Sequence, residues 1–214
     1  MKMAMDLAWT SISSGSLGID AVVTTVDGTV VSTGRNRLYE SDPGDDVLAG
    51  TTLAHAEMNA PAKMRSGQHR STHLVLWTTL QACLQCLGAI RLSDIDEVRV
   101  LAPDPLFRGV EQARHLNGFI GRRWPTIHEL PVSEWSVLSL LFPTHTATFW
   151  NASVEGWNDH IPTLVQLAED LVASGELVGH ATAGDDVMSV ADALWDRLSC
   201  CVDDVARLAA LERT

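Results

Sequence analysis

The segment at residues 78–90 reads TTLQACLQCLGAI and places Cys83 and Cys86 in a C-x-x-C spacing. The run HLVLWTTL before the cysteines predicts a buried strand, and ACLQCLGAIRL predicts a helix that begins beside them. The spacing alone supports three interpretations: half of a structural zinc site, a redox-active dithiol, or two ligands of a catalytic metal. At a helix start both sulfurs point toward one place, where free N–H groups favour thiolates. The choice depends on what else the fold brings to that place.

A second short motif lies upstream, where residues 53–60 read LAHAEMNA. His55 and Glu57 are two residues apart, and in the middle of a helix such side chains point to nearly opposite sides. The residues from 54 to about 65 follow a helical pattern, which Pro61 would kink or end. His55 and Glu57 can therefore share a pocket only if this helix begins beside them.

The two motifs together favour a catalytic metal. If their helix starts face each other at the sheet edge, His55, Cys83 and Cys86 supply three ligands of a tetrahedral zinc, and the fourth position stays open for water. One neutral imidazole and two thiolates leave the zinc without net charge, so that water is less acidified than beside three histidines. A general base is then needed, and Glu57 is a carboxylate that coordination does not require.

This set of residues resembles the zinc-dependent cytidine/deoxycytidylate deaminase superfamily, and within it the branch of guanine deaminases, cytosine deaminases and tRNA adenosine deaminases. HAEMNA and TLQACLQCLGAI match the runs that open two helices in that branch, and the similarity extends over about residues 5 to 130. Ala82 stands where the family usually has proline, and Gln81 where this branch often has glutamate. We expect these two replacements to affect substrate choice more than metal binding.

The resemblance implies a zinc-dependent hydrolytic deaminase of a small amino-substituted nucleobase, nucleoside or related heterocycle, with a guanine-type substrate as the first guess. Glu57 would take a proton from water and deliver protons to a ring nitrogen and the departing ammonia. Asn36, in the GRN run after the first hairpin, stands where the family places a base-binding asparagine, and would offer a donor and an acceptor. In APDPLFRGVEQ, Asp104 and Phe107 are further substrate-binding candidates, with loop or core packing as the alternative.

Two alternative functions remain open. The first is a tRNA or single-stranded nucleic-acid adenosine or cytidine deaminase. The formal net charge of -12 opposes it, because proteins that bind phosphate backbones gather lysine and arginine. The second is a non-catalytic, zinc-binding protein with a deaminase fold, which a general base at Glu57 argues against.

The pattern of elements predicts an α/β fold. A first helix over residues 1 to 13 precedes the hairpin IDAVVTTVDGTVVSTGRN, and the strands EVRVLAP and TIHEL flank a helical stretch at 109–119. We expect a three-layer α/β/α sandwich with a mixed central sheet of about five strands, as in cytidine deaminases. Residues 1–150 would form the deaminase domain.

Residues 151–214 differ in style and carry 12 acidic but only 3 basic side chains. Apolar residues recur at helical spacing on both sides of SGELVGHATAGDD, which predicts a helical hairpin joined by that linker. This C-terminal extension would pack on the domain or on a partner subunit, with a lid over the active site as the functional alternative.

The cellular setting follows from composition. Four cysteines in 214 residues are too few for a disulfide framework, so we expect a reducing cytoplasm. No segment offers the ~20 apolar residues of a membrane span. The predicted partners are a small amino-heterocycle and water, and the resemblance implies a homodimer.

Overall fold

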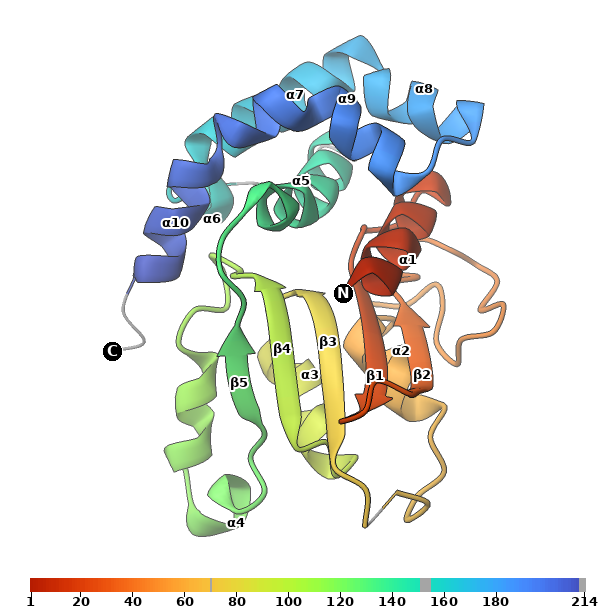
Figure 1. The fold of residues 1–214 in the computed structure, drawn as a ribbon, viewed down its shortest axis with the longest axis vertical. Coiled ribbons are helices and arrows are strands. Elements are labelled where there is room, and N and C mark those ends of the chain that lie inside the picture. Colours follow the sequence, from red (N-terminus) through yellow and green to blue (C-terminus); the bar gives the residue numbers. More distant parts are fainter. Residues whose placement is uncertain (70, 151–154, 212–214) are drawn as a thin grey trace.

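The computed structural model describes residues 1–69, 71–150 and 155–211, and its centre is a five-stranded mixed sheet (Figure 1). The strands β1 (Asp20–Thr25) and β2 (Val30–Arg35) form an antiparallel hairpin, and β1 also pairs antiparallel with β3 (Leu74–Leu80). The strands β4 (Glu97–Ala102) and β5 (Thr126–Glu129) extend the sheet in parallel, giving the order β2-β1-β3-β4-β5. The predicted α/β fold with five strands is confirmed.

One face of the sheet is covered by α2 (Ala56–Ala62) and α3 (Leu84–Leu92) (Figure 1). Alternate strand residues such as Leu76 and Val98 are fully buried against these helices. At Gly34 a Cβ atom would lie 2.3 Å from the backbone of α2, so only glycine lets the helix approach β2 this closely. This contact fixes where α2 begins relative to the sheet.

The opposite side is covered by α1 (Lys2–Ser13) and α5 (Glu134–Phe149), which lie toward the carboxyl ends of β3 and β4 (Figure 1). These helices complete the predicted three layers. The sequence did not predict α5, although it lies at the centre of the molecule. Residues 136–147 of α5 are buried without interruption, because the sheet lies on one side of the helix and the C-terminal helices on the other. Its hydroxyl groups bond to carbonyl oxygens of the helix or of the sheet: Thr144 donates to the Leu140 carbonyl oxygen at 2.7 Å, and Ser139 donates to the Thr79 carbonyl oxygen on β3.

The C-terminal extension packs on α5 through a shared apolar core. Its elements are α6 (Glu155–Asn158), α7 (Pro162–Ser174), α8 (Glu176–Ala183), α9 (Val187–Ser199) and α10 (Val202–Ala210). The predicted two-helix hairpin is wrong, because the expected linker forms α8. Gly175 and Gly184, with φ of +70° and +76°, end α7 and α8 and turn the chain. The junction predicted at residues 150 and 151 borders residues 151–154, which lie outside the described residues.

Two smaller expectations also changed. The helical stretch predicted at 109–119 is a 3-10 helix, η1 (Val110–His115), followed by the single turn α4 (Gly118–Gly121). Pro61 lies in the last turn of α2, which ends one residue later at Ala62. Within the described ranges, no helix combines the length and the apolar character that crossing a membrane requires.

Candidate active site

The two motif helices begin side by side at the carboxyl end of β3. His55 is the N-cap residue of α2 and Cys83 is the N-cap residue of α3, and both have extended backbone conformations. Cys86 lies in the first turn of α3. The three side chains converge: Cys86 Sγ lies 3.4 Å from His55 Nδ1 and 3.4 Å from Cys83 Sγ, and Cys83 Sγ lies 3.8 Å from His55 Nδ1. The predicted meeting of two helix starts is confirmed.

These distances fit a tetrahedral zinc. Zn–S bonds of ~2.3 Å and Zn–N bonds of ~2.0 Å place tetrahedral sulfur ligands ~3.8 Å apart, and sulfur and nitrogen ligands ~3.5 Å apart. The ligand atoms of His55, Cys83 and Cys86 all lie within 4.8 Å of one another. Hydrogen bonds from Cys86 and His55 lower the pKa of the Cys83 thiol to about 4. The pKa of Cys86 is raised, because Cys86 donates a hydrogen bond to Cys83 and because its thiol is buried. Both sulfurs can be thiolates together only with a cation between them.

Glu57 lies beside the three ligands, lines the same cavity as His55 and Cys83, and is only 3% exposed. Its Oε1 accepts a hydrogen bond from Thr78 Oγ1 at 3.0 Å, and its Oε2 lies 3.6 Å from Cys86 Sγ. Burial raises the pKa of this carboxyl, while the nearby His55 opposes that effect. A carboxyl with a raised pKa can both accept and return a proton near neutral pH.

A cavity of about 130 Å³ opens onto His55, Glu57 and Cys83. The predicted substrate-binding residues Asn36, Asp104 and Phe107 all line it. The other residues that line it are mostly apolar and come from distant parts of the sequence. They are Leu17, Ile19, Leu80, Gln81, Leu106, Pro143 and Trp157. The structure thus brings all the predicted site residues together, with Cys86 fully buried behind the cavity.

The orientation of Asn36 differs from the expectation. Its Oδ1 accepts hydrogen bonds from the Leu38 backbone N–H at 3.1 Å and from Ser16 Oγ at 3.0 Å. A backbone N–H can only donate, so the carboxamide oxygen must face Leu38. Asn36 therefore offers the cavity its NH₂ group as a donor, and not an acceptor as well.

Gln81 organises the loop that carries Asp104 and Phe107. Its Nε2 donates to the Phe107 carbonyl oxygen at 3.0 Å, and its Oε1 accepts from the Asp104 backbone N–H at 3.2 Å and from Arg108 Nη1 at 3.3 Å. A glutamate carboxylate could not donate to the Phe107 carbonyl oxygen, and this gives a structural reason for glutamine at position 81. Asp104 is 4% exposed, and burial raises the pKa of its carboxyl to about 6.

The sequence did not single out Pro143 of α5 or Trp157 of α6 as pocket residues. Neither belongs to a motif with fixed spacing, and neither α5 nor α6 was predicted from the sequence. In the sequence, only the alternative that the C-terminal extension forms a lid over the active site concerned Trp157.

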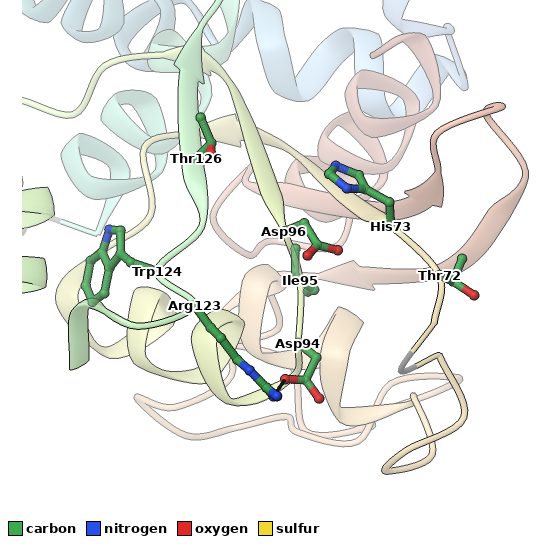
Figure 2. Close-up of a pocket in the computed structure, with 8 residues that line it drawn as sticks. All are labelled: Thr72, His73, Asp94, Ile95, Asp96, Arg123, Trp124 and Thr126. Carbon is green, nitrogen blue, oxygen red and sulfur yellow. Dashed lines mark hydrogen bonds and ion pairs between the residues drawn. The ribbon is translucent and has the colours of Figure 1, made fainter. Parts of the chain in front are cut away.

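A wider cavity of about 870 Å³ lies at the other end of the strands, near the amino ends of β4 and β5 (Figure 2). Figure 2 shows a polar lining in which Arg123 and Asp94 form an ion pair at 2.8 Å. Ligands of open α/β sheets bind beyond the carboxyl ends of the strands, which is where the smaller cavity lies.

Comparisons with known proteins agree with this geometry. Residues 1–102 match the family model described as the cytidine and deoxycytidylate deaminase zinc-binding region. A tRNA-specific adenosine deaminase from Streptococcus pyogenes serotype M1 is 30% identical over 113 residues, which are 52% of this chain and 61% of that protein. The aligned region thus spans less than two thirds of this curated relative.

Solved structures share the fold. A structure from a study of A-to-I editing by tRNA:A34 deaminases at the wobble position aligns with a TM-score of 0.50 and 25% identity, covering 61% of this chain and 95% of that one. Guanine deaminase from Nitrosomonas europaea aligns with a TM-score of 0.50 and 16% identity, covering 68% of this chain and 81% of that one. Residues 1–102, which contain strands β1 to β4 and the convergent His55, Cys83 and Cys86, match the cytidine and deoxycytidylate deaminase zinc-binding region, and the complete five-stranded sheet has the cytidine deaminase-like fold.

Proposed function

We propose that this protein is a zinc-dependent hydrolytic deaminase of a small amino-substituted heterocycle, with a free guanine-type base as the first substrate to test. The observation that carries this proposal is the buried Glu57 carboxyl, which faces the same cavity as the ligand atoms of His55 and Cys83. A structural zinc site has no need of a titratable carboxyl in that position. This argues for a catalyst over a non-catalytic zinc protein.

His55, Cys83 and Cys86 would hold the zinc, which as a Lewis acid activates water for attack on the amine-bearing ring carbon. Glu57 would take one proton from the water as the new C–O bond forms and pass it to a ring nitrogen. It would then take the remaining proton from the new hydroxyl group and pass it to the leaving nitrogen. The C–N bond then breaks and ammonia departs. Thr78, at 3.0 Å, holds the Glu57 carboxyl in place through these transfers. The NH₂ group of Asn36 orients the ring by donating to an acceptor on its edge.

The size of the cavity favours a single heterocycle. Pockets for drug-sized ligands measure ~300–1,000 Å³, whereas this one measures about 130 Å³. Phe107 and the apolar walls suit a flat ring, and the few polar groups are placed to orient it.

The rival within the family is a tRNA adenosine deaminase, which the 30% identical relative favours. The net charge of -12 and the small cavity support the free base over a polynucleotide.

The decisive experiment measures ammonia release by the zinc-loaded protein from guanine, cytosine, adenine and their nucleosides. We expect turnover of at least one free base, with activity lost on chelation and restored by zinc. Activity that survives complete zinc removal would contradict the metal assignment. Tight, salt-sensitive tRNA binding together with deamination of a tRNA anticodon arm would favour the rival.

The homodimer and the cytoplasmic location stay predictions. Two large apolar side chains of α3, Leu84 and Leu92, are 56% and 75% exposed, and a partner subunit would shield them. Light scattering of the purified protein measures the oligomeric state directly.

A further inference from the structure

Several residues that line the active-site cavity lie beyond the family-matched residues 1–102, and one of them, Trp157 of α6, belongs to the C-terminal extension. Helix α6 approaches the 103–109 loop very closely, since a Cβ atom at Gly156 would lie 2.4 Å from Leu106 Cδ2. The chain after Trp157 is anchored as well. The Ile161 N–H donates to the Trp157 carbonyl oxygen at 2.8 Å, and the Ile161 side chain is fully buried in the core of the extension. Trp157 is thus a fixed part of the wall.

The indole N–H of Trp157 is a buried donor with no hydrogen bond of regular geometry among the described residues. Buried donors are paired in the great majority of cases, and an exception needs an explanation. The Asp104 carboxyl lines the same cavity and is also buried. The indole N–H is directed toward this carboxyl and lowers its pKa against the larger effect of burial, so Asp104 is the acceptor beside the indole in the ligand-free pocket. A donor and an acceptor therefore stand next to each other on one side of the cavity.

We propose that Trp157 is a substrate-binding and specificity-determining residue, whose indole N–H donates to a carbonyl oxygen of the heterocycle while Asp104 accepts from the adjacent ring N–H. This inference rests on the proposed function and narrows its substrate class. An amino-heterocycle with a lactam edge, a ring N–H beside C=O, satisfies both groups at once. A heterocycle without that carbonyl offers the indole N–H no acceptor. A binding site built to form a hydrogen bond discriminates strongly against a substrate that lacks the partner group.

Gln81 supports this arrangement from the other side of the loop. It binds the backbone of Asp104 and of Phe107, and Arg108, which contacts Gln81, donates to the Ala209 and Leu211 carbonyl oxygens at the end of α10. The loop that carries Asp104 is therefore held by the same extension that supplies Trp157. The extension is a part of the pocket and not a separate appendage.

The test compares Trp157→Phe with Trp124→Phe. Phenylalanine keeps an aromatic wall but removes the N–H together with the rest of the five-membered ring. Trp124 is a matched control, because Trp124→Phe loses the same atoms, including a buried indole N–H, and Trp124 lines the other cavity. The substrates are two pairs that differ by the carbonyl: guanine with 2-aminopurine, and cytosine with 4-aminopyrimidine. We expect Trp157→Phe to lower kcat/KM about tenfold for the oxo member of the preferred pair and less than about threefold for its partner. Trp124→Phe should change neither.

A spectroscopic readout makes the test independent of turnover rates. In zinc-loaded, ¹⁵N-labelled protein the indole resonance that is missing from Trp157→Phe belongs to Trp157, and it should shift when the oxo compound is added. Turnover with unchanged discrimination in Trp157→Phe, or an unmoved resonance with the oxo compound bound, would overturn this inference and leave the proposed function standing. Failure of every heterocycle to release ammonia from the wild-type protein would overturn both.

Discussion

Two walls of one small cavity come from regions of very different character. The motif wall is built from the starts of α2 and α3, where His55, Glu57 and Cys83 occupy positions that helix geometry dictates. The extension wall is a single tryptophan on α6, a helix of four residues. The motif wall carries the titratable and metal-ligating side chains, whereas the extension wall contributes shape and one buried indole N–H. Under the two proposals above, the motif wall performs the chemistry and the extension wall influences the choice of substrate.

The largest effect should come from Glu57→Gln on the motif wall. Glutamine keeps the shape and the bond to Thr78 but cannot move protons, so kcat should fall ~10²–10⁴-fold. The zinc content, measured by atomic absorption, should stay at the wild-type level, because Glu57 is not needed for coordination. His55→Ala is the contrasting variant and should lose both zinc and activity. Undiminished turnover by Glu57→Gln would show that Glu57 is not the group that transfers protons.

Arg108 connects the 103–109 loop to the C-terminal extension, so substituting it should weaken the contact between these two parts of the protein. Its guanidinium, 11% exposed, pairs with Glu129 at 2.6 Å and holds two carbonyl oxygens at the end of α10. Arg108→Ala removes all of these bonds, so we expect the free energy of unfolding to fall by ~2–3 kcal/mol in urea titrations. Arg197→Ala is the matched control, because its pair with Glu176 lies within the extension and the two side chains are 38% and 33% exposed. It should cost at most ~0.5 kcal/mol, and equal losses would contradict an anchoring role for Arg108.

The motif wall could be predicted from the sequence because its signals are local. Helix starts, a two-residue spacing in HAE and a three-residue spacing in C-x-x-C constrain where side chains point before any tertiary contact is known. The orientation of Asn36 could not be predicted in the same way. It depends on Ser16, which lies 20 residues earlier in the sequence, and on the fold of the loop that follows Asn36.

The centre of the molecule was harder to predict than its active site. Helix α5 is buried over residues 136–147 and mixes hydroxyl-bearing with apolar side chains around its circumference, whereas a periodicity signal requires one polar and one apolar side. The segment at α8 contains helix-ending glycines on both sides, which the sequence suggested as a loop. Trp157 belongs to no motif, since a lone aromatic residue has no spacing that separates core packing from a pocket wall; only the alternative of a lid formed by the extension concerned it.

Within the extension, Asp204 should be a stabilising cap. Its Oδ2 accepts from the Thr163 backbone N–H at 2.8 Å, at the start of α7, although the two residues lie on different helices. Asp204→Ala should lower the free energy of unfolding by ~1 kcal/mol, measured by chemical denaturation, because that N–H has no intrahelical acceptor. The neighbouring Asp203 is exposed on the same turn and gives the control, with a change within ~0.5 kcal/mol for Asp203→Ala. Similar effects of the two variants would argue against the cap.

The smallest effect concerns the pH dependence of stability, which should come from Asp20 at the start of β1. This carboxyl is fully buried; Ser11 donates to its Oδ2 at 3.0 Å, and Oδ1 has no partner among the described residues. Burial raises the pKa of Asp20 well above its ordinary value, so the folded state holds this proton more tightly than the unfolded chain does. The contribution to stability is therefore fully present below the unfolded value of ~3.9, and it is lost as the pH rises through the raised pKa. Asp20→Asn should show a smaller fall in Tm between pH 5 and pH 8 than the wild-type protein does. An unchanged fall in Asp20→Asn would place the pH dependence at another buried carboxyl, such as Asp104 on the cavity wall.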